Sequence, residues 1–162
     1  MKVAAVFRFR KTLTALALIA WGAPVIAASS TSSFDVSIQV LATCSISASN
    51  MTFSSITTGT TSNTDATSSL TVNCSNGTPY TVSLGNGNNY SGGRRMTNGS
   101  TNINYYLYAD SGRSTQWNVA APQAGTGNGA DQSLTIYGRV PSGQSVPQTG
   151  AYSDTIIATV TY

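Results

Sequence analysis

The side chains able to do chemistry are few in this sequence, and all of its carboxylates are aspartates. These are scattered along the chain: Asp35, Asp65, Asp110, Asp131 and Asp154. There is no His and no Glu, and both lysines lie within the first eleven residues. Acid–base catalysis near neutral pH relies on His, tuned Glu or Lys, and zinc sites need His or several thiolates. We therefore expect no enzymatic activity, no metal site and no cofactor.

Three stretches resemble ligand sites but have simpler interpretations. The loop 125–129 is glycine-rich, but it lacks the following helix and the spacing of a phosphate-binding fingerprint. The stretch 92–95 contains two arginines that could hold an anion, and we interpret it as a solvated loop. Tyr106 and Tyr108, with Asp110 beyond them, could stack on a sugar, but they also fit the outer face of a sheet.

Residues 1–27 have the three-part pattern of a secretory signal peptide. A basic head precedes the apolar run Leu13–Trp21, and the small residue Ala27 stands at the end. Gly22 and Pro24 interrupt the apolar segment, which is short for a membrane helix. We expect cleavage after Ala27 and export of the remaining chain.

Cleavage would reverse the sign of the net charge. The whole chain has eight Lys and Arg against five Asp, a net charge of +3. Four of the basic residues lie in the leader, so the rest carries 4 − 5 = −1. No basic surface for nucleic acid remains, and we expect no nucleic-acid partner.

Two cysteines, Cys44 and Cys74, lie in the exported part. In an oxidising compartment they predict one internal disulfide, whose loop spans 74 − 44 = 30 positions. Closing such a loop contributes roughly 3–4 kcal/mol in the chain-entropy model. Two free thiols or an intermolecular bridge are the alternatives.

After the leader, 162 − 27 = 135 residues remain, and they show strand patterns without helical spacing. Short β-rich runs recur at 44–47, 51–56, 69–74, 79–84, 103–109, 133–140 and 155–162. Asn-Gly pairs, which favour tight turns, stand at 76–77, 86–87, 98–99 and 128–129. Residues 85–102 and 120–132 are predicted to be long polar loops. This punctuation predicts one all-β domain, a β-sandwich.

Apolar residues alternate within the runs and predict their inner faces. Three runs each place three such residues on one side: Leu70, Val72 and Cys74; Tyr80, Val82 and Leu84; Ile103, Tyr105 and Leu107. We expect residues 75–78 to join the runs 69–74 and 79–84 as a hairpin.

A further alternating run follows the leader directly. Its apolar side is formed by Phe34, Val36, Ile38 and Val40, and its polar side by Asp35, Ser37 and Gln39. The run is either the first strand of a complete sandwich or a strand that pairs with another molecule. Only three residues separate Val40 from Cys44, which leaves little room between a donor strand and a first strand of the domain, and the sequence alone leaves both interpretations open.

A series of motifs in the exported chain matches a known family. They are Cys44-Ser45-Ile46, Val72-Asn73-Cys74, Tyr80–Leu84, Arg95-Met96, Tyr105–Asp110, Leu134–Val140, Gly150–Thr155 and the aromatic end Tyr162. From about Phe34 to Tyr162 the chain resembles the spore coat protein U domain family, which includes the Csu-type subunits of archaic chaperone–usher pili. The resemblance covers nearly the whole exported chain.

The resemblance implies an incomplete immunoglobulin-like β-sandwich that lacks its last strand and is completed by donor-strand complementation. A periplasmic chaperone would lend a strand, and at an outer-membrane usher the N-terminal strand of a neighbouring pilin subunit would replace it. Residues 28–41 would then be the donor-strand segment and 42–162 the sandwich domain. The donor residues would be Phe34, Val36, Ile38 and Val40, and the acceptor-groove edge strand would present Ile156, Ala158, Val160 and Tyr162.

The expected function is thus a structural pilus subunit that supports adhesion and biofilm formation, exported through the periplasm to the cell surface. The alternative is a secreted spore-coat or matrix protein of the same fold that is self-sufficient as a monomer. A sugar-binding tip adhesin would need an additional receptor domain.

Overall fold

The computed structural model describes residues 26–57, 59–145 and 148–162, which contain strands and no helix. The predicted signal peptide lies outside this part, except for its last two residues. In the described ranges no helix is long and apolar enough to cross a membrane. The chain divides into a unit that ends at Ile38 and a second unit, Gln39–Tyr162. Residues 26–43 are extended and belong to no strand.

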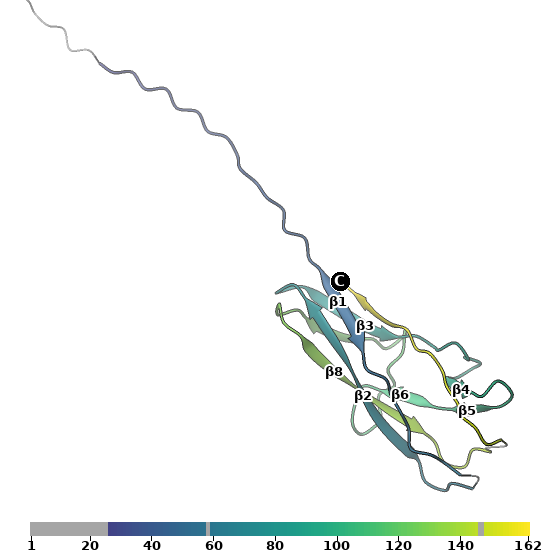
Figure 1. The fold of residues 1–162 in the computed structure, drawn as a ribbon. Helices are drawn as coiled ribbons and strands as arrows, with labels where there is room; N and C mark the ends of the chain where they lie inside the picture. Colours follow the sequence, from purple (N-terminus) through teal and green to yellow (C-terminus); the bar gives the residue numbers. More distant parts are fainter. Residues whose placement is uncertain (1–25, 58, 146–147) are drawn as a thin grey trace, which may run out of the picture. The chain divides into compact units, whose positions relative to one another are not determined.

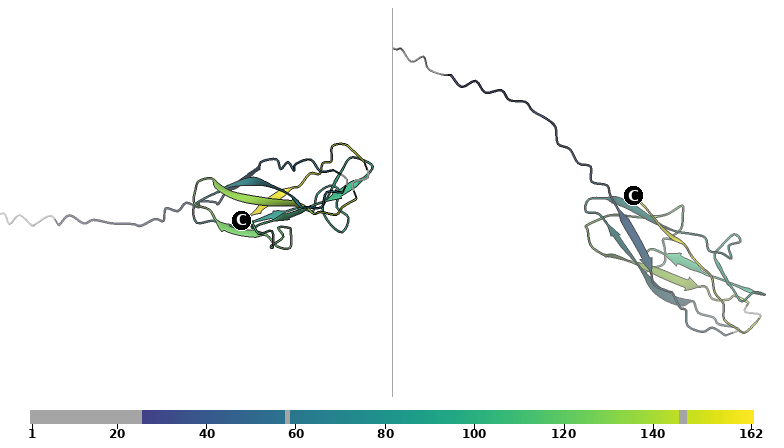
Figure 2. Two further views of the ribbon diagram at one scale, coloured as in Figure 1. Left: turned by 90° about the horizontal axis from the view of Figure 1, so that it is seen from below. Right: turned by 45° about the horizontal axis from the view of Figure 1, so that its top comes forward.

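The second unit is a β-sandwich (Figure 1). One sheet has the order β1-β2-β8-β6, with β1 Cys44–Ala48, β2 Thr64–Cys74, β8 Gln132–Val140 and β6 Tyr106–Tyr108. The other has the order β7-β3-β9, with β7 Gln123–Thr126, β3 Pro79–Leu84 and β9 Ala158–Thr161. The pair β4 Arg95–Thr97 and β5 Asn102–Asn104 lies at the end away from the C-terminus. All named pairings are antiparallel, and the views in Figure 2 show the two layers.

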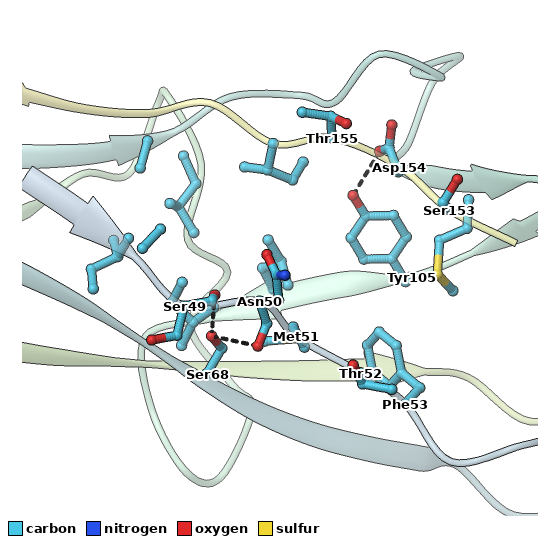
Figure 3. A pocket seen from close by; sticks show the side chains of 18 of the residues that line it. Ser49, Asn50, Met51, Thr52, Phe53, Ser68, Tyr105, Ser153, Asp154 and Thr155 are labelled. Carbon is cyan, nitrogen blue, oxygen red and sulfur yellow. Dashed lines mark hydrogen bonds between the residues drawn. The ribbon is translucent and has the colours of Figure 1, made fainter.

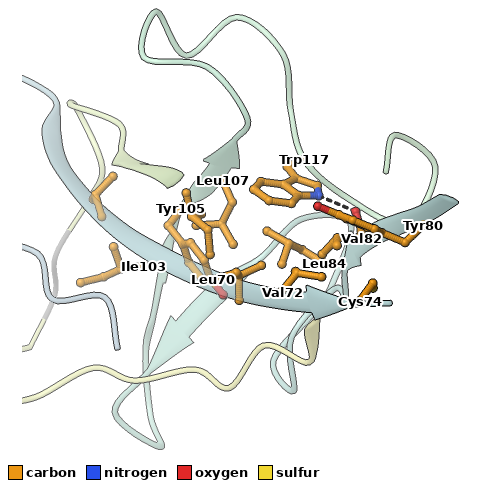
Figure 4. Packing of buried hydrophobic residues seen from close by; sticks show 12 residues of the cluster. Leu70, Val72, Cys74, Tyr80, Val82, Leu84, Ile103, Tyr105, Leu107 and Trp117 are labelled. Carbon is orange, nitrogen blue, oxygen red and sulfur yellow. Dashed lines mark hydrogen bonds between the residues drawn. The ribbon is translucent and has the colours of Figure 1, made fainter. Parts of the chain in front are cut away.

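The core lies between the two sheets, and the predicted inner faces are confirmed (Figure 4). The buried apolar residues are Leu70, Val72, Cys74, Tyr80, Val82, Leu84, Ile103, Tyr105, Leu107, Trp117, Ile136 and Val140. The Trp117 Nε1–H donates to the Val82 carbonyl at 2.9 Å, so the indole is buried with its polar atom satisfied.

The expected hairpin at 75–78 is wrong, because β2 and β3 belong to different sheets. The turn carries the chain across the sandwich, with Gly77 at φ 78° and its N–H donating to the Gly127 carbonyl at 2.8 Å. Alternation shows which side of a strand is apolar, but both sheets direct that side at the same core. The pattern could not therefore distinguish a hairpin from a crossing.

Several predicted boundaries also differ. Residues 51–56 are not a strand, and the run 103–109 divides between β5 and β6 in separate sheets. The predicted loops 85–102 and 120–132 contain β4 and β7, respectively. Residues 51–56 nevertheless contribute Met51, Phe53 and Ile56 to the edge of the core. Their hydrophobicity reflects side-chain packing without ladder hydrogen bonds.

The turns at the Asn-Gly pairs are confirmed. Each of the four glycines has a φ in the left-handed region, between 76° and 93°, where other residues are strained.

The interpretation of residues 92–95 as a solvated loop is wrong for Arg94, which is only 8% exposed. Its guanidinium donates to three backbone carbonyls, those of Leu84, Gly85 and Trp117, at 2.8–2.9 Å. Burial is the main effect on this group and lowers the pKa of Arg94. Arg94 thereby joins the end of β3 to the segment that carries Trp117.

An ionic cluster lies on the outer face of the first sheet. Asp65 accepts two hydrogen bonds from Arg139 at 2.8 Å, and Arg113 lies 3.3 Å from the same carboxylate. The hydrogen bond from Arg139 is the main cause that lowers the pKa of Asp65. Tyr106 and Tyr108 are on this face too, with ring centroids 6.4 Å apart. The expected outer sheet face is therefore observed.

Candidate functional site

An open groove follows one edge of the sandwich (Figure 3). One wall is formed by residues 48–57, which begin at the end of β1, and the other by residues 148–158, which lead into β9. The groove consists of two hollows of about 450 and 690 Å³. They share the lining residues Met51, Thr52, Phe53, Met96 and Tyr152, so they form one continuous depression.

The floor of the groove is the apolar core itself. Leu70, Leu84, Leu107 and Ile136 line one hollow, and Ile103 and Val140 line the other. All six side chains are buried against their own sheets. An apolar side chain entering the groove would therefore contact the centre of the sandwich.

A glycine in β8 makes room for one wall of the groove. A Cβ on Gly138 would meet the Met51 Sδ and would lie 2.8 Å from the Phe53 Cζ. With hydrogen at this position, the two side chains pack over β8. Gly138 thus determines how far the wall 48–57 stands back from the groove.

The β9 side of the groove has an unpaired backbone edge. Hydrogen bonds tie Ser153, Thr155 and Ile157 to Thr97, Asn88 and Gly85. Because the bonding direction alternates along an antiparallel strand, the even-numbered residues 152–160 turn their N–H and C=O groups toward the groove. None of these groups bonds to a residue within the described ranges.

The β1 side has a similar free edge. Ser75 N donates to Thr43 O, and Ser49 N donates to Ser69 O, each at 2.9 Å, so the odd-numbered positions pair with β2. The backbone groups of Cys44, Ile46 and Ala48 consequently point the other way. Beyond the ends of these two strands, the strand position between residues 48–57 and residues 148–158 is unfilled.

Polar side chains near the groove form hydrogen bonds within the domain. The Asp154 carboxylate accepts from the backbone N–H groups of Asn88 and Asn89 at 2.9 and 3.2 Å, and from the Tyr105 hydroxyl at 2.7 Å. Burial, followed by the hydrogen bond to Asp154, raises the pKa of Tyr105 well above its usual range. Ser68 anchors the opposite wall by donating to the Ser49 carbonyl at 2.6 Å.

The predicted acceptor residues have different positions relative to the groove. Ile156 and Ala158 line it, and Val160 is half-buried further along β9. Tyr162 follows the end of β9 and is 59% exposed. Ile157, which lies between Ile156 and Ala158 in the sequence, is 68% exposed on the opposite side of the chain.

The predicted donor residues form an exposed apolar series. Phe34, Val36, Ile38 and Val40 are each 85–91% exposed and belong to no strand. Large apolar side chains that recur at every second position are seldom left in water in a folded protein.

The predicted disulfide between Cys44 and Cys74 is confirmed. It joins residues that are also paired in the β1–β2 register. The bond therefore fixes the first residue of β1 to the last residue of β2.

Two further carboxylates, those of Asp110 and Asp131, have structural partners. Asp110 accepts from the backbone N–H groups of Ser114 and Thr115, and these hydrogen bonds lower the pKa of Asp110. Asp131 accepts from the Asn73 amide at 2.8 Å. In the described ranges no three residues of the types His, Cys, Asp and Glu lie close enough to hold a metal.

Sequence reasoning missed the wall 48–57, Gly138 and the hydrogen bonds of Asp154. Only the wall had a usable signal, the apolar Met51, Phe53 and Ile56, which was interpreted as a strand. Gly138 sits inside a run of β-forming residues, and nothing in that run identifies its neighbours.

The fold and groove define a class of protein: an all-β sandwich with one strand position unfilled. The Spore Coat Protein U domain family matches residues 30–159, and the chain belongs to this family. The match confirms the family resemblance drawn from the sequence motifs.

This chain is similar to two known proteins over part of their length. Protein U of Myxococcus xanthus is 38% identical over 76 residues, which are 43% of this chain and 40% of that protein. A chain in the crystal structure of the CsuC–CsuE chaperone–tip adhesion subunit pre-assembly complex, from the archaic chaperone–usher Csu pili of Acinetobacter baumannii, aligns with a TM-score of 0.56 and 25% identity. That alignment covers 76% of this chain and 40% of the other. The chain thus spans about 40% of the length of each protein, and the predicted incomplete immunoglobulin-like sandwich is confirmed.

Proposed function

We propose that this protein is a structural subunit of an archaic chaperone–usher pilus and polymerises by donor-strand exchange. The single observation that carries the proposal is the unfilled strand position, with its apolar floor and two free backbone edges. The same chain also carries an exposed alternating strand, Phe34–Val40. A strand from one copy would complete the sandwich of another.

The backbone geometry supports strand addition. On β9, the residues whose side chains face inward are also those whose N–H and C=O groups are free. In an antiparallel pair, directly opposite residues share a face. An incoming strand would therefore form hydrogen bonds at the same residues that bury its side chains in the groove. Each buried plug would contribute about 1.5–3 kcal/mol.

The partners follow from this mechanism. An open sheet edge over an apolar floor aggregates unless it is covered, so a periplasmic chaperone would lend a strand before assembly. An outer-membrane usher would then be the place where the neighbouring subunit replaces it. The proposed location is the cell surface after export through the periplasm, with a role in adhesion and biofilm formation rather than catalysis.

The experiment compares two double variants of the chain without residues 1–27. Val36→Asp with Ile38→Asp places charges on the apolar side of the donor strand, and Ser37→Asp with Gln39→Asp places the same charges on the polar side. Each chain is refolded from urea, and polymers are measured by size-exclusion chromatography and electron microscopy. We expect loss of polymers only for the first variant, because an unpaired carboxylate buried in the groove is strongly unfavourable.

Equal polymerisation of both variants would contradict the donor role. A wild-type chain that refolds as a stable monomer would instead support the alternative, a self-sufficient secreted coat or matrix protein. Both variants have the same net charge, so solubility alone cannot separate them.

A further inference from the structure

The four Asn-Gly pairs of this chain are candidates for a spontaneous modification. In such a pair the backbone nitrogen of glycine can attack the asparagine side chain, because no Cβ obstructs its approach. We propose that Asn86 is the site at which the folded domain deamidates, and that the product loosens the groove wall 148–158. The proposal is independent of the proposed pilus function.

The reaction consumes water and needs no other reagent. The Gly87 nitrogen gives its proton to solvent and attacks the Asn86 Cγ, and the side-chain nitrogen leaves as ammonia when the succinimide ring closes. Water then opens the ring at either of its carbonyls. The products are aspartate and isoaspartate, and in the latter the main chain passes through the former side chain. Each event exchanges NH2 for OH and adds a negative charge at neutral pH.

The attacking nitrogen is already hydrogen-bonded in three of the four pairs. These bonds, at 2.8–3.0 Å, are Gly77 N to Gly127 O, Gly129 N to Cys74 O and Gly99 N to Thr97 Oγ1. Gly87 N forms no hydrogen bond with any residue of the described ranges. A bonded N–H must first be released by local opening, so the attack within the pair 86–87 avoids a step that the other pairs require.

A local irregularity of the strand pairing explains why Gly87 N is free. The flanking backbone bonds are Gly85 N to Ile157 O at 2.8 Å and Asn88 N to Thr155 O at 3.2 Å. Between them, Asn86 and Gly87 stand opposite the single residue Ile156. Two residues opposite one is the count of a β-bulge, whose extra residue is left unpaired.

The Asn86 side chain is also free to turn toward Gly87. It is exposed and forms no hydrogen bond within the described ranges. The side-chain oxygens of Asn98 and Asn128, in contrast, accept from the backbone N–H groups two positions further on, at 3.0 and 2.9 Å. Asn76 is exposed like Asn86, so the two differ chiefly in the bond made by the following glycine. Asn76 is therefore a matched comparison within the same molecule.

The product would disturb the groove wall because the bulge supports it. A Cβ on Gly87 would meet the Asp154 Oδ2, so the wall packs directly against this glycine. Isoaspartate inserts a carbon atom into the main chain between the two flanking bonds that hold Thr155 and Ile157. The longer chain no longer matches their spacing, and we expect both bonds to weaken.

The test ages the chain without residues 1–27 in neutral buffer, both folded and unfolded in urea with the disulfide reduced. Samples are digested with chymotrypsin, which can cut at Tyr80 between the first two pairs, and mass spectrometry measures the exchange of NH2 for OH at each asparagine. In the folded chain we expect Asn86 to deamidate at least about threefold faster than Asn76, the factor expected from one backbone hydrogen bond. In urea the two rates should be similar.

The effect on the wall is measured by hydrogen exchange of the amides 85–89 in the same aged samples, with Asn86→Gln as the control. We expect aged wild type to lose protection there and the aged variant to keep it. If Asn76 reacts as fast as Asn86 in the folded chain, or if their ratio is unchanged in urea, the assignment of the site is overturned. Equal protection in aged wild type and aged variant would overturn the effect on the wall.

Discussion

Replacing Arg94 by Met should destabilise the domain by about 3 kcal/mol or more. The guanidinium donates four hydrogen bonds to three carbonyls, those of Leu84, Gly85 and Trp117. Leaving a buried acceptor unsatisfied costs about 1–3 kcal/mol, so three acceptors give a lower bound of about 3. Met retains much of the apolar stem, so the difference reports mainly the hydrogen bonds.

The matched control is Arg95→Met, one residue further along. Arg95 is only half-buried, and its Nε donates to one carbonyl, that of Asn89, at 3.0 Å. Both variants lose one positive charge. We expect the control to lose about 1 kcal/mol.

The assay is urea unfolding followed by tryptophan fluorescence, because Trp117 is in the core and accepts a bond from Arg94 through its carbonyl. An excess of a peptide of residues 30–42 is added to keep the chains from polymerising. With a slope of about 2 kcal/mol/M, a loss of 3 kcal/mol lowers the midpoint by about 1.5 M. Equal, small shifts for both variants would refute the assignment of Arg94 as a buried structural group.

Three further predictions concern the groove and its supports. Gly138→Val should leave the domain folded by circular dichroism but reduce polymer formation, because the added side chain displaces the wall 48–57 into the groove. Replacing Cys44 and Cys74 by Ser should lower the free energy of unfolding by roughly 3–4 kcal/mol, and a reducing agent should have no further effect on that variant in urea unfolding. The raised pKa of Tyr105 means that the folded state keeps a proton that the unfolded state loses above pH of about 10. Stability should therefore be constant below that pH and fall above it, and Tyr105→Phe should weaken this alkaline loss in pH-dependent melting experiments.

The sequence was sufficient for features that depend on alternation and on a few special residues. The inner faces of β2 and β3, the turns at the Asn-Gly pairs and the Cys44–Cys74 bond all follow from local chemistry. The assignment of strands to sheets does not follow from local chemistry, because a residue that faces the core is apolar in either sheet.

The walls of the groove were also only partly predictable from the sequence. The groove residues Ile156 and Ala158 were implied by the family resemblance, whereas residues 51–56 resembled a strand because their apolar side chains touch the core. Arg94 was placed in solvent because arginine is rarely buried without a carboxylate. Three backbone carbonyls converge on it, and no sequence pattern reveals that geometry.

The disulfide also determines how the domain responds to mechanical force. A pull on the N-terminal segment reaches the sandwich at Cys44, the first residue of an edge strand. Hydrogen bonds alone would let such a strand unzip one pair at a time. The covalent link passes the tension instead to β2, an interior strand paired on both sides, so the domain should bear traction on its N-terminus without losing β1.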